Sequence, residues 1–400
     1  MDKTKILALA AQAEEEMTAL RHELHRHPEL GWQEVRTTDT IERELKKIGC
    51  AVLRRGFAGT RCGLVCDVNP DSPGACVAIR ADIDALAVAR EDNDLEYASA
   101  VPGVMHACGH DAHAASLIGA AKIFKALEKE LPGRVRLMFQ PSEEQATAPG
   151  AKALIEEGVL DGVDAVIGYH VRAGAPEGEI QFTPGPATTS GDIWELDVIG
   201  KGGHGSRPQD AVDPTVAAAQ IICALQTVVS REITPGERVV VSIGTLKSGS
   251  AVNVIPEKCE ITGNIRTTNP AVRATLPERI ERIANGVGLA MRCRTDFRFI
   301  PVYPSVVNDE AMCQLLEQAA GELFGAEKVK RVPISSGSDD FNFYSAERPS
   351  VYFNVGMGGP GTPYAAAHHS PQFRTNDAIL KTCAAAVVAT ACKFLEAKAK

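Results

Sequence analysis

The chain has 400 residues, of which 44% are hydrophobic and 23% are charged, and its formal net charge at pH 7 is −9. This composition is that of a folded protein of two or three domains, so global disorder and fibrous structure are excluded. The acidic balance also argues against non-specific binding to nucleic acid or to an anionic membrane, because both need a basic face. We therefore expect no nucleic-acid partner and no membrane partner.

The sequence favours a cytoplasmic location. We find no stretch that reaches the roughly 18 apolar residues of a membrane span. The N-terminal segment turns acidic at once and lacks a clean cleavage site, so we predict no signal peptide. The 11 cysteines are scattered and odd in number, which favours reduced thiols over a disulfide framework. Cys62 and Cys66 have no second cysteine pair nearby, so we predict buried thiols rather than a zinc ribbon.

Helices are predicted at three places in the first half of the chain. One ends before Pro28, and another covers residues 38–48, where Gly49 is suited to end it. A third begins at Asp111, which we expect to act as the N-cap, because apolar residues recur after it at helical spacing.

Three predicted strands end in polar side chains. They cover residues 76–84, 134–144 and 164–170, and their ends carry Asp82, Glu143, Glu144 and His170. Strands that alternate with helices predict an α/β unit with a mostly parallel sheet, whose ligand site lies beyond the carboxyl ends of the strands. Cys108 and His110, at the start of the third helix, are expected at the same edge of the sheet.

From about residue 188 the order of elements changes to β-α-β-β-α-β, which is that of a ferredoxin-like sandwich. The expected elements are a strand at 193–199, a helix at 214–230, strands at 239–246 and 259–266, a helix at 274–290 and a strand at 293–302. The chain then returns to α/β, with a helix at 310–324, a strand at 350–355 and a helix at 376–395. We therefore predict a catalytic domain formed by residues 1–187 and 303–400, with an inserted domain at 188–302.

The segment HACGHD combines donors that suit a transition metal. Cys108 and His110 stand two residues apart, and thiolate, imidazole and carboxylate together suit zinc, manganese, cobalt or nickel. A C-x-H pair alone is weak evidence, since most such pairs are incidental. Joined with Glu144, His170 and the late His368-His369 pair, it favours a metal centre.

Glu143 and Glu144 offer two adjacent carboxylates. Neighbouring side chains of an extended segment point apart, so one can bind metal while the other faces water. A carboxylate beside metal-activated water is the usual general base of metal-assisted hydrolysis. On the dipeptide alone, a solvated loop pair is the commoner structure.

The inserted domain contributes three candidates. His204 lies in GKGGHGSRP, and because no GxGxxG or GK[ST] pattern opens a helix there, nucleotide binding is not predicted. Arg266 can clamp a substrate carboxylate, which we expect Asn253 also to hold, although a surface arginine of a sheet is the ordinary alternative. Asp339 and Asp340, later in the chain, could support the site.

Other catalytic classes fit less well. The sequence has no G-x-S-x-G elbow for a serine mechanism. A cysteine nucleophile would be Cys108, but a thiolate among histidines and carboxylates would capture a metal.

Together these motifs resemble the aminoacylase/carboxypeptidase family of dinuclear metallopeptidases, and within it the hippurate-hydrolase-like branch. That branch includes N-acyl-amino-acid amidohydrolases, hydrolases of auxin–amino-acid conjugates and p-aminobenzoyl-glutamate hydrolase subunits. The resemblance covers nearly the whole chain, with the motifs RHELHRHPELGWQE, IRADIDAL, MHACGHDAH, FQPSEE, GKGGHGSRP, NVIP, GSDDF and HHSPQF in order.

The resemblance implies a zinc-peptidase-like catalytic domain that holds two divalent metal ions per subunit, zinc or manganese, with cobalt or nickel as alternatives. The implied ligands are Cys108, His110, Glu144, His170 and His369. His369 stands four residues before Phe373, as the family's last ligand stands before an aromatic residue, and His368 is second choice. Glu143 would be the general base, with His204, Asn253 and Arg266 acting from the inserted domain. That domain dimerises in the family, so a homodimer or a dimer of dimers is expected.

Two departures from the family pattern affect specificity. Ala87 stands where relatives usually have the proline of DALP, and Ser338 and Asp339 change the usual GEDF pattern. We predict a metal-dependent amidohydrolase acting on small N-acyl or N-aroyl amino acids. The alternatives are a dipeptidase or carboxypeptidase with the same metal chemistry, a non-catalytic binding protein on the same fold, and a redox thiol protein centred on Cys108.

Overall fold

The computed structural model describes residues 1–399 and divides them into two compact units. The first unit comprises Met1–Ala187, Val307–Pro333 and the described residues from Asp340 onward. The second unit comprises Thr188–Val306 and Ile334–Asp339. It runs past residue 302, where the expected insertion ends, and includes a short later segment.

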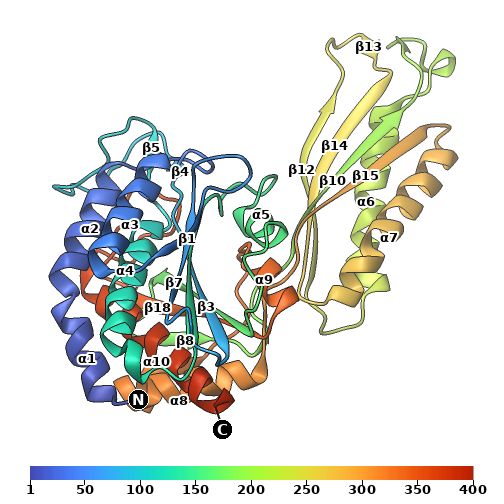
Figure 1. The fold of residues 1–400 in the computed structure, drawn as a ribbon. Helices are drawn as coiled ribbons and strands as arrows, with labels where there is room; N and C mark the ends of the chain where they lie inside the picture. The colour runs from blue at the N-terminus through green and yellow to red at the C-terminus, as the bar shows by residue number, and fades with distance from the viewer. Residues whose placement is uncertain (400) are drawn as a thin grey trace. The chain divides into compact units, whose positions relative to one another are not determined.

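The first unit is built on an eight-stranded sheet with the order β1-β2-β6-β3-β7-β18-β8-β17 (Figure 1). The four central strands are parallel, as are β8 and β17, whereas β1, β2 and the β18–β8 pair are antiparallel. The bounds are β1 (Val52–Arg55), β2 (Leu64–Val68), β3 (Cys76–Asp82), β6 (Arg134–Gln140), β7 (Ala165–Ala173), β8 (Ile180–Phe182), β17 (Val329–Arg331) and β18 (Ser350–Gly358). The predicted α/β unit with a mostly parallel sheet is confirmed.

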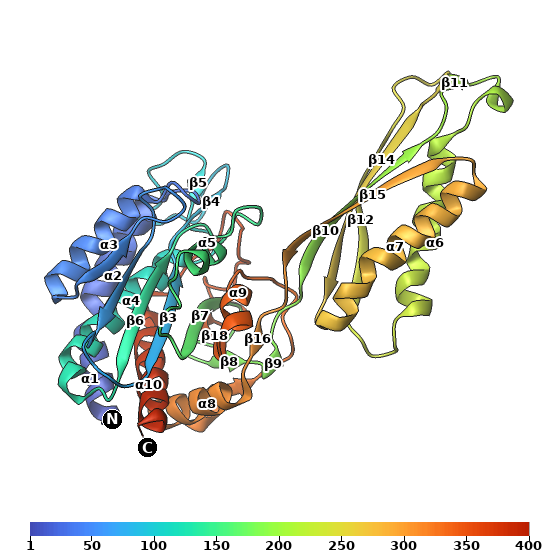
Figure 2. The same cartoon turned by 45° about the vertical axis from the view of Figure 1, so that its right-hand side comes forward.

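Helices cover both faces of this sheet (Figures 1 and 2). One face carries α1 (Lys3–Gln12), α2 (Glu14–Arg26), α3 (Val35–Ile48), α4 (His110–Leu127) and α10 (Leu380–Lys398), and α8 (Glu310–Phe324) packs beside α10. The other face carries α5 (Gly150–Glu156) and α9 (Asn342–Glu347). Two small ladders complete the unit: β4 (Leu86–Ala87) with β5 (Val104–Met105), and β9 (Gly185–Pro186) with β16 (Val307–Asn308).

Helix α10 shows why apolar length alone does not define a membrane span. The segment Asp377–Lys398 is long and apolar enough to cross a membrane, and one 18-residue window of it has a mean hydropathy of 1.7. The expectation that no segment would reach that threshold was therefore wrong. In the structure, 78% of this window is buried inside the protein, where it packs against α4 and α8. It is the apolar core helix of the first unit.

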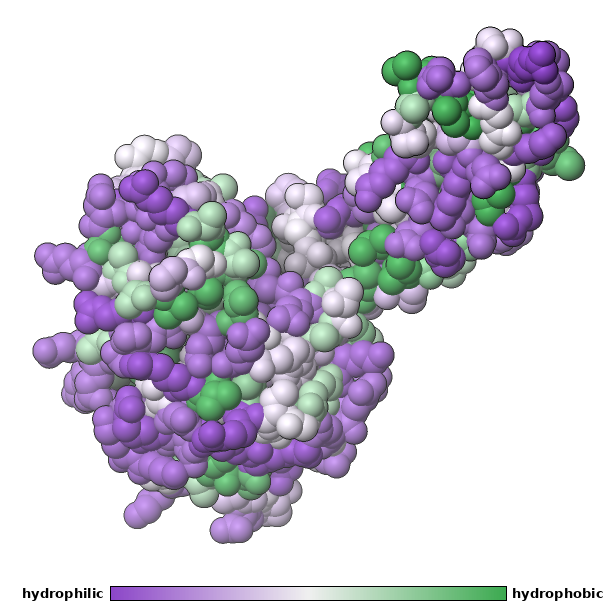
Figure 3. Space-filling model, turned by 90° about the horizontal axis from the view of Figure 1, so that it is seen from above, coloured by the Kyte–Doolittle hydropathy of each residue, from purple (hydrophilic) through white to green (hydrophobic). Residues whose placement is uncertain are grey.

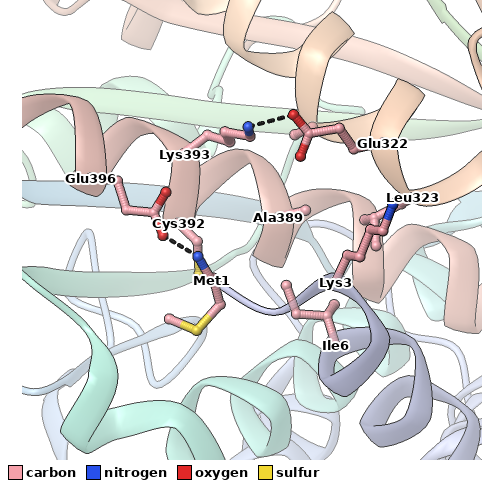
Figure 4. A pocket seen from close by; sticks show the side chains of 10 residues that line it. Met1, Lys3, Ile6, Glu322, Leu323, Ala389, Cys392, Lys393 and Glu396 are labelled. Atoms are coloured by element: carbon pink, nitrogen blue, oxygen red, sulfur yellow. Dashed lines mark hydrogen bonds and ion pairs between the residues drawn. The ribbon is translucent and has the colours of Figure 1, made fainter.

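A small pocket lies among α1, α8 and α10 (Figure 4). At its rim, Lys393 Nζ lies 2.6 Å from Glu322 Oε1. Cys392 also lines it, and none of the ten lining residues is a candidate metal ligand or general base.

The second unit is the predicted ferredoxin-like sandwich. Its antiparallel sheet has the order β12-β14-β10-β15, and α6 and α7 pack against it. The bounds are β10 (Gly191–Ile199), α6 (Pro214–Glu232), β12 (Val239–Ser248), β14 (Lys258–Thr267), α7 (Pro270–Ala290) and β15 (Arg294–Tyr303). Trp194, fully buried, lies in its core. A two-stranded ladder of β11 (Gly203–His204) and β13 (Val254–Ile255) lies at one end of this unit (Figure 2).

Candidate metal centre

The candidate ligands of the first unit come from separate segments that meet at the carboxyl end of its parallel strands. His170 lies within β7, and Glu143 and Glu144 follow the end of β6. His110 opens α4, and Cys108 lies in the turn before it. The sheet therefore brings together residues that lie far apart in the sequence, as its parallel order requires.

The donor atoms of these residues converge. Cys108 Sγ lies 3.4 Å from His170 Nε2, and His369 Nε2 lies 3.2 Å from Glu144 Oε1. Two groups each have their donors within 4.8 Å of one another: Cys108, His110 and His170, and Cys108, Glu144 and His369. Cys108 belongs to both groups. Together these donors could hold two metal ions.

An unpartnered buried atom supports the same conclusion. His110 Nε2 is buried and has no hydrogen-bond partner among the described residues, although a buried polar nitrogen is normally paired. It lies 3.6 Å from Asp82 Oδ2 and 3.9 Å from Glu144 Oε1. Sulfur, imidazole and carboxylate donors of this kind fit divalent zinc, manganese, cobalt or nickel.

Asp84 fixes the orientation of two of these ligands. His110 Nδ1 lies 3.1 Å from Asp84 Oδ1 and 3.0 Å from the Asp84 backbone oxygen. Asp84 Oδ2 accepts a hydrogen bond of 2.9 Å from the Glu144 backbone N–H. Sequence reasoning placed this residue at the strand end but gave it no role. The only available sequence evidence was its spacing two residues after Asp82.

The carboxylates dominate the electrostatics of the centre. Although burial opposes its protonation, Asp82, Asp84 and Glu144 raise the pKa of His110 to about 10. Burial, with Glu144 and Glu143 nearby, also raises the pKa of the Cys108 thiol well above its usual value. The site thus carries excess negative charge, which divalent cations would neutralise while displacing the protons of the thiol and the imidazole.

A second buried network, of hydrogen bonds and ion pairs, lies next to the candidate ligands. His113 Nδ1 lies 2.5 Å from Asp82 Oδ1, and His113 Nε2 accepts a hydrogen bond of 2.9 Å from the Val171 N–H, beside His170. Arg80 binds both Asp82 and Asp340, at 2.5 Å and 2.6 Å. Asp340 therefore contacts Arg80 inside the first unit.

The start of α4 differs from the predicted one. The N-cap is Gly109 with a φ of 93°, and Asp111 is the second residue of the helix. A Cβ atom at Gly109 would lie 2.3 Å from Val171 Cγ2, so both the backbone angle and the space require glycine. Asp111 is buried and binds Arg21 Nη1 at 3.0 Å and His25 Nδ1 at 2.9 Å. Arg21 and His25 had no predicted role, and only their motif RHELHRHP drew attention to them.

The two late histidines differ in their surroundings. His368 is half-buried, its Nε2 accepts a hydrogen bond of 3.2 Å from the Ala173 N–H, and burial lowers its pKa to about 3. His369 has a φ of 64°, in the left-handed region that costs energy for a non-glycine residue, and its side chain reaches Glu144. Strain of this kind at a cluster of donors is typical of functional sites.

The three candidates of the second unit do not all lie together. His204 and Asn253 lie in the β11–β13 region, where Gly205 N donates to Asn253 O at 2.9 Å. Arg266 lies near the far end of β14, roughly 25 Å away along the strand, by the rise per residue. Within one copy of this unit, Asn253 and Arg266 therefore cannot bind the same small carboxylate.

The His204 ring is held by its neighbour. Its Nδ1 accepts hydrogen bonds from the Ser206 backbone N–H at 3.1 Å and lies 2.9 Å from Ser206 Oγ. In the neutral ring this leaves the proton on Nε2, which can donate to a ligand. The side chain is exposed.

Residues 78–393 match the family described as Peptidase family M20/M25/M40. The chain belongs to this family. Among its M20 relatives, the chain is 39% identical over 361 residues to an N-acetylcysteine deacetylase from Bacillus subtilis, covering 90% of this chain and 92% of that protein. It is 34% identical over 384 residues to thermostable carboxypeptidase 1 from Saccharolobus solfataricus, covering 96% of both.

A solved M20 structure agrees with the fold and the chemistry. The structure of a dinuclear metal-binding M20 peptidase from Bacillus subtilis has a TM-score of 0.85 to this chain at 34% identity, covering 96% of this chain and 99% of that one. The expected family is confirmed. The protein is a metal-dependent M20 hydrolase of amide bonds.

Proposed function

We propose that this M20 protein hydrolyses the amide bond of N-acyl or N-aroyl amino acids, with two divalent metal ions held by Cys108, His110, Glu144, His170 and His369. The observation that carries the proposal is the convergence of these sulfur, nitrogen and oxygen donors beside the Glu143 carboxylate. Zinc or manganese suits the donor set, with cobalt or nickel as alternatives. When bound, such ions polarise the scissile carbonyl and lower the pKa of water.

The protein's own groups would handle the proton and the charge. Glu143, whose carboxylate lies within 4.8 Å of donors of His110 and Glu144, takes the proton of the attacking water and passes it to the leaving amine. His204 donates its Nε2–H to the developing oxyanion. Arg266 or Asn253 binds the carboxylate of the amino acid.

We also propose that the protein works as a homodimer, or a dimer of dimers, formed through the second unit. Strand β12 is at an edge of its sheet, and α6 packs beside it. The exposed side chains along most of α6 are uncharged: Thr215, Val216, Ala219, Gln220, Cys223, Gln226, Thr227, Val229 and Ser230. An open edge strand beside an uncharged helix face is suited to pairing with a second copy.

Other observations support this assembly and a cytoplasmic location. Hydrophobic side chains are exposed on the second unit (Figure 3), including Val216, Val240 and Leu246. Asn253 and Arg266 could bind the same substrate carboxylate if one came from each subunit.

The cysteines support a cytoplasmic location. All 11 cysteines, which lie in the described part of the chain, are free thiols, as suits a reducing compartment.

A carboxypeptidase is the second candidate, favoured by the similarity to the Saccharolobus enzyme. The test is hydrolysis by the protein reconstituted with Mn²⁺ or Zn²⁺, using N-acetyl and N-benzoyl amino acids beside matched dipeptides. We expect faster turnover of the acyl amino acids and loss of activity on chelation. Preference for dipeptides would favour the carboxypeptidase, and no turnover of either class would favour a binding protein. Activity that survives chelation would favour thiol chemistry at Cys108.

A further inference from the structure

A short turn that holds none of the candidate ligands packs against the loop that carries two of the candidate residues. Residues 31–34, with the sequence GWQE, form what we call the 31–34 turn. Residues 142–150, which follow β6 and include Glu143 and Glu144, form the 142–150 loop. The turn belongs to the motif HPELGWQE, which the proposed reaction does not use.

Glu34 holds the first residue of the loop. Its side chain is fully buried, and its Oε1 accepts a hydrogen bond of 2.8 Å from the Ser142 backbone N–H. Ser142 has a φ of 55°, a conformation that costs energy for a residue with a side chain and persists only where the surroundings enforce it. Because Ser142 directly precedes Glu143, the backbone angle at Ser142 determines where the two following carboxylates point.

Two further hydrogen bonds tie the turn to the middle and the far part of the loop. Gln145 Nε2 donates to the Gly31 backbone oxygen at 2.8 Å. Trp32 Nε1 donates to the Ala148 backbone oxygen at 2.8 Å. The turn therefore contacts the loop before and after the two glutamates.

The fit between turn and loop leaves no room at Gly31. A Cβ atom there would lie 2.8 Å from Ser142 Oγ and 2.9 Å from Gln145 Nε2. Gly31 has no positive φ, so its backbone would accept alanine without strain. Alanine at this position would displace the Ser142 hydroxyl and the Gln145 amide, and with the amide the hydrogen bond from Gln145 to Gly31.

The turn itself has a rigid base. The Ala85 N–H, next to Asp84, donates to the Glu29 backbone oxygen at 2.8 Å. Glu29 Oε2 accepts a hydrogen bond of 2.8 Å from the Thr37 N–H in the first turn of α3. Glu29, two residues before the 31–34 turn, is thus held between the start of α3 and the segment that follows β3.

We infer that the 31–34 turn is a clamp that positions Glu143 and Glu144, with Glu34 as its principal positioning residue. Glu34 acts through the backbone of Ser142 and touches neither substrate nor metal. The catalytic consequence rests on the proposed roles of Glu143 and Glu144. The effect on the loop backbone and on metal affinity does not depend on which amide is hydrolysed.

The test compares Glu34→Ala, Glu34→Gln and Gly31→Ala with Gln33→Ala in the full-length protein. Gln33 lies in the same turn and its side chain is exposed, so its removal is the matched control. For each variant, the melting temperature, the amide hydrogen exchange of residues 142–150, the Mn²⁺ affinity by calorimetry, and kcat and KM are measured.

We expect Glu34→Ala and Gly31→Ala to speed exchange in the loop and to weaken Mn²⁺ binding by about tenfold or more. Because small displacements of catalytic groups cost roughly 10²-fold, kcat should fall by about that factor while KM changes little. Glu34→Gln keeps an oxygen acceptor for the Ser142 N–H, so it should retain most of the wild-type kcat and Mn²⁺ affinity. Gln33→Ala should resemble the wild type.

Several results would overturn the inference. One is a Glu34→Ala protein that melts earlier but keeps its Mn²⁺ affinity and kcat, which would make Glu34 a residue of stability only. Another is a Glu34→Gln protein as impaired as Glu34→Ala, which would exclude the acceptor role. If the wild type hydrolyses no acyl amino acid, the proposed function fails, while exchange and Mn²⁺ affinity still decide on the clamp.

Discussion

His110 Nδ1 lies 3.1 Å from the carboxylate and 3.0 Å from the backbone oxygen of Asp84. Both Asp84 atoms are acceptors, so Nδ1 carries the proton and Nε2 is left to bind a cation. Partners of this kind orient a metal-binding imidazole and increase its basicity. The same carboxylate also accepts from the Glu144 N–H, which makes Asp84 a shared support of two ligands.

We therefore predict that Asp84→Asn weakens metal binding by about 10- to 100-fold without unfolding the protein. The two carboxylate oxygens of Asp84 accept from His110 Nδ1 and from the Glu144 N–H. An amide has one oxygen in place of two, so one of these two hydrogen bonds is lost. Titration of the metal-free protein with Mn²⁺ measures the effect, and Asp71→Asn, at an exposed position, is the control. Equal affinities for the two variants would remove Asp84 from the support of the ligands.

Glu143→Gln tests the proposed general base. Glu143 is 8% exposed, and its Oε1 accepts a long hydrogen bond of 3.4 Å from the Asp340 N–H, which glutamine can also accept. The variant should keep its fold and its metal but lose turnover by roughly 10²–10⁴-fold, the usual worth of general-base help. Steady-state kinetics beside metal analysis check this. A variant that keeps more than about a tenth of the wild-type kcat would contradict the role.

Cys108→Ser tests the proposed thiolate ligand. A neutral hydroxyl replaces a soft anionic donor, so the metal should be held more weakly and lost on mild dialysis. Cys223→Ser changes an exposed thiol and should leave the metal content unchanged. If both proteins retain equal metal after dialysis, Cys108 is only packed near the centre.

Much of this architecture could be predicted from local pattern. The ends of β3, β6 and β7 follow from short apolar runs that stop at polar residues, and parallel order then places those residues at one edge. The position of Gly49 as the left-handed C-cap of α3, with a φ of 80°, was likewise predictable from residue type.

The remainder depends on contacts between segments far apart in the sequence. Asp111 is a good N-cap by residue type, but Arg21 and His25 bind it inside the helix, and nothing local to HACGHD reveals those partners. By length and composition α10 resembles a membrane span. Only the tertiary structure shows that it is buried inside the protein. The hydrogen bond from Ser142 to Glu34 is equally invisible in the sequence, since it joins two loops through the backbone of one of them.

His25 predicts a pH dependence of stability. Its two ring nitrogens lie 2.9 Å from Asp111 Oδ2 and 2.9 Å from Glu91 Oε1. Although burial opposes protonation, these carboxylates raise its pKa to about 9, above the value of about 6.5 in an unfolded chain. A raised pKa gives stability that is fully present below about pH 6.5 and is lost as the pH rises through about 9.

In chelator, the free energy of unfolding of the wild type should therefore fall between pH 6.5 and 9 by up to roughly 3 kcal/mol from this group. His25→Gln should be less stable at pH 6.5 and should show a flatter profile. His27→Gln, at a partly exposed position of the same segment, should follow the wild type. Denaturant unfolding at several pH values measures the profiles, and parallel curves for wild type and His25→Gln would contradict the prediction.

The last prediction concerns His204, which lies in a different unit from every candidate ligand. If its Nε2–H stabilises the oxyanion, a contact made mainly in the transition state, His204→Ala should lower kcat sharply. Metal content and dimerisation should be unchanged, because the His204 ring is exposed and, among the described residues, hydrogen-bonds to Ser206. A normal kcat in His204→Ala would remove the histidine from the mechanism.

Mixing subunits then shows whether the dimer completes the site. His204→Ala and Glu143→Gln homodimers each lack one group in every site. In a heterodimer with sites completed by the partner's second unit, one site has both groups intact and the other has neither. Mixing should then restore activity toward the level of one working site per heterodimer. Heterodimers that form but show no rescue would mean that each chain completes its own site, and the separation of Asn253 from Arg266 would then exclude one of them from substrate binding.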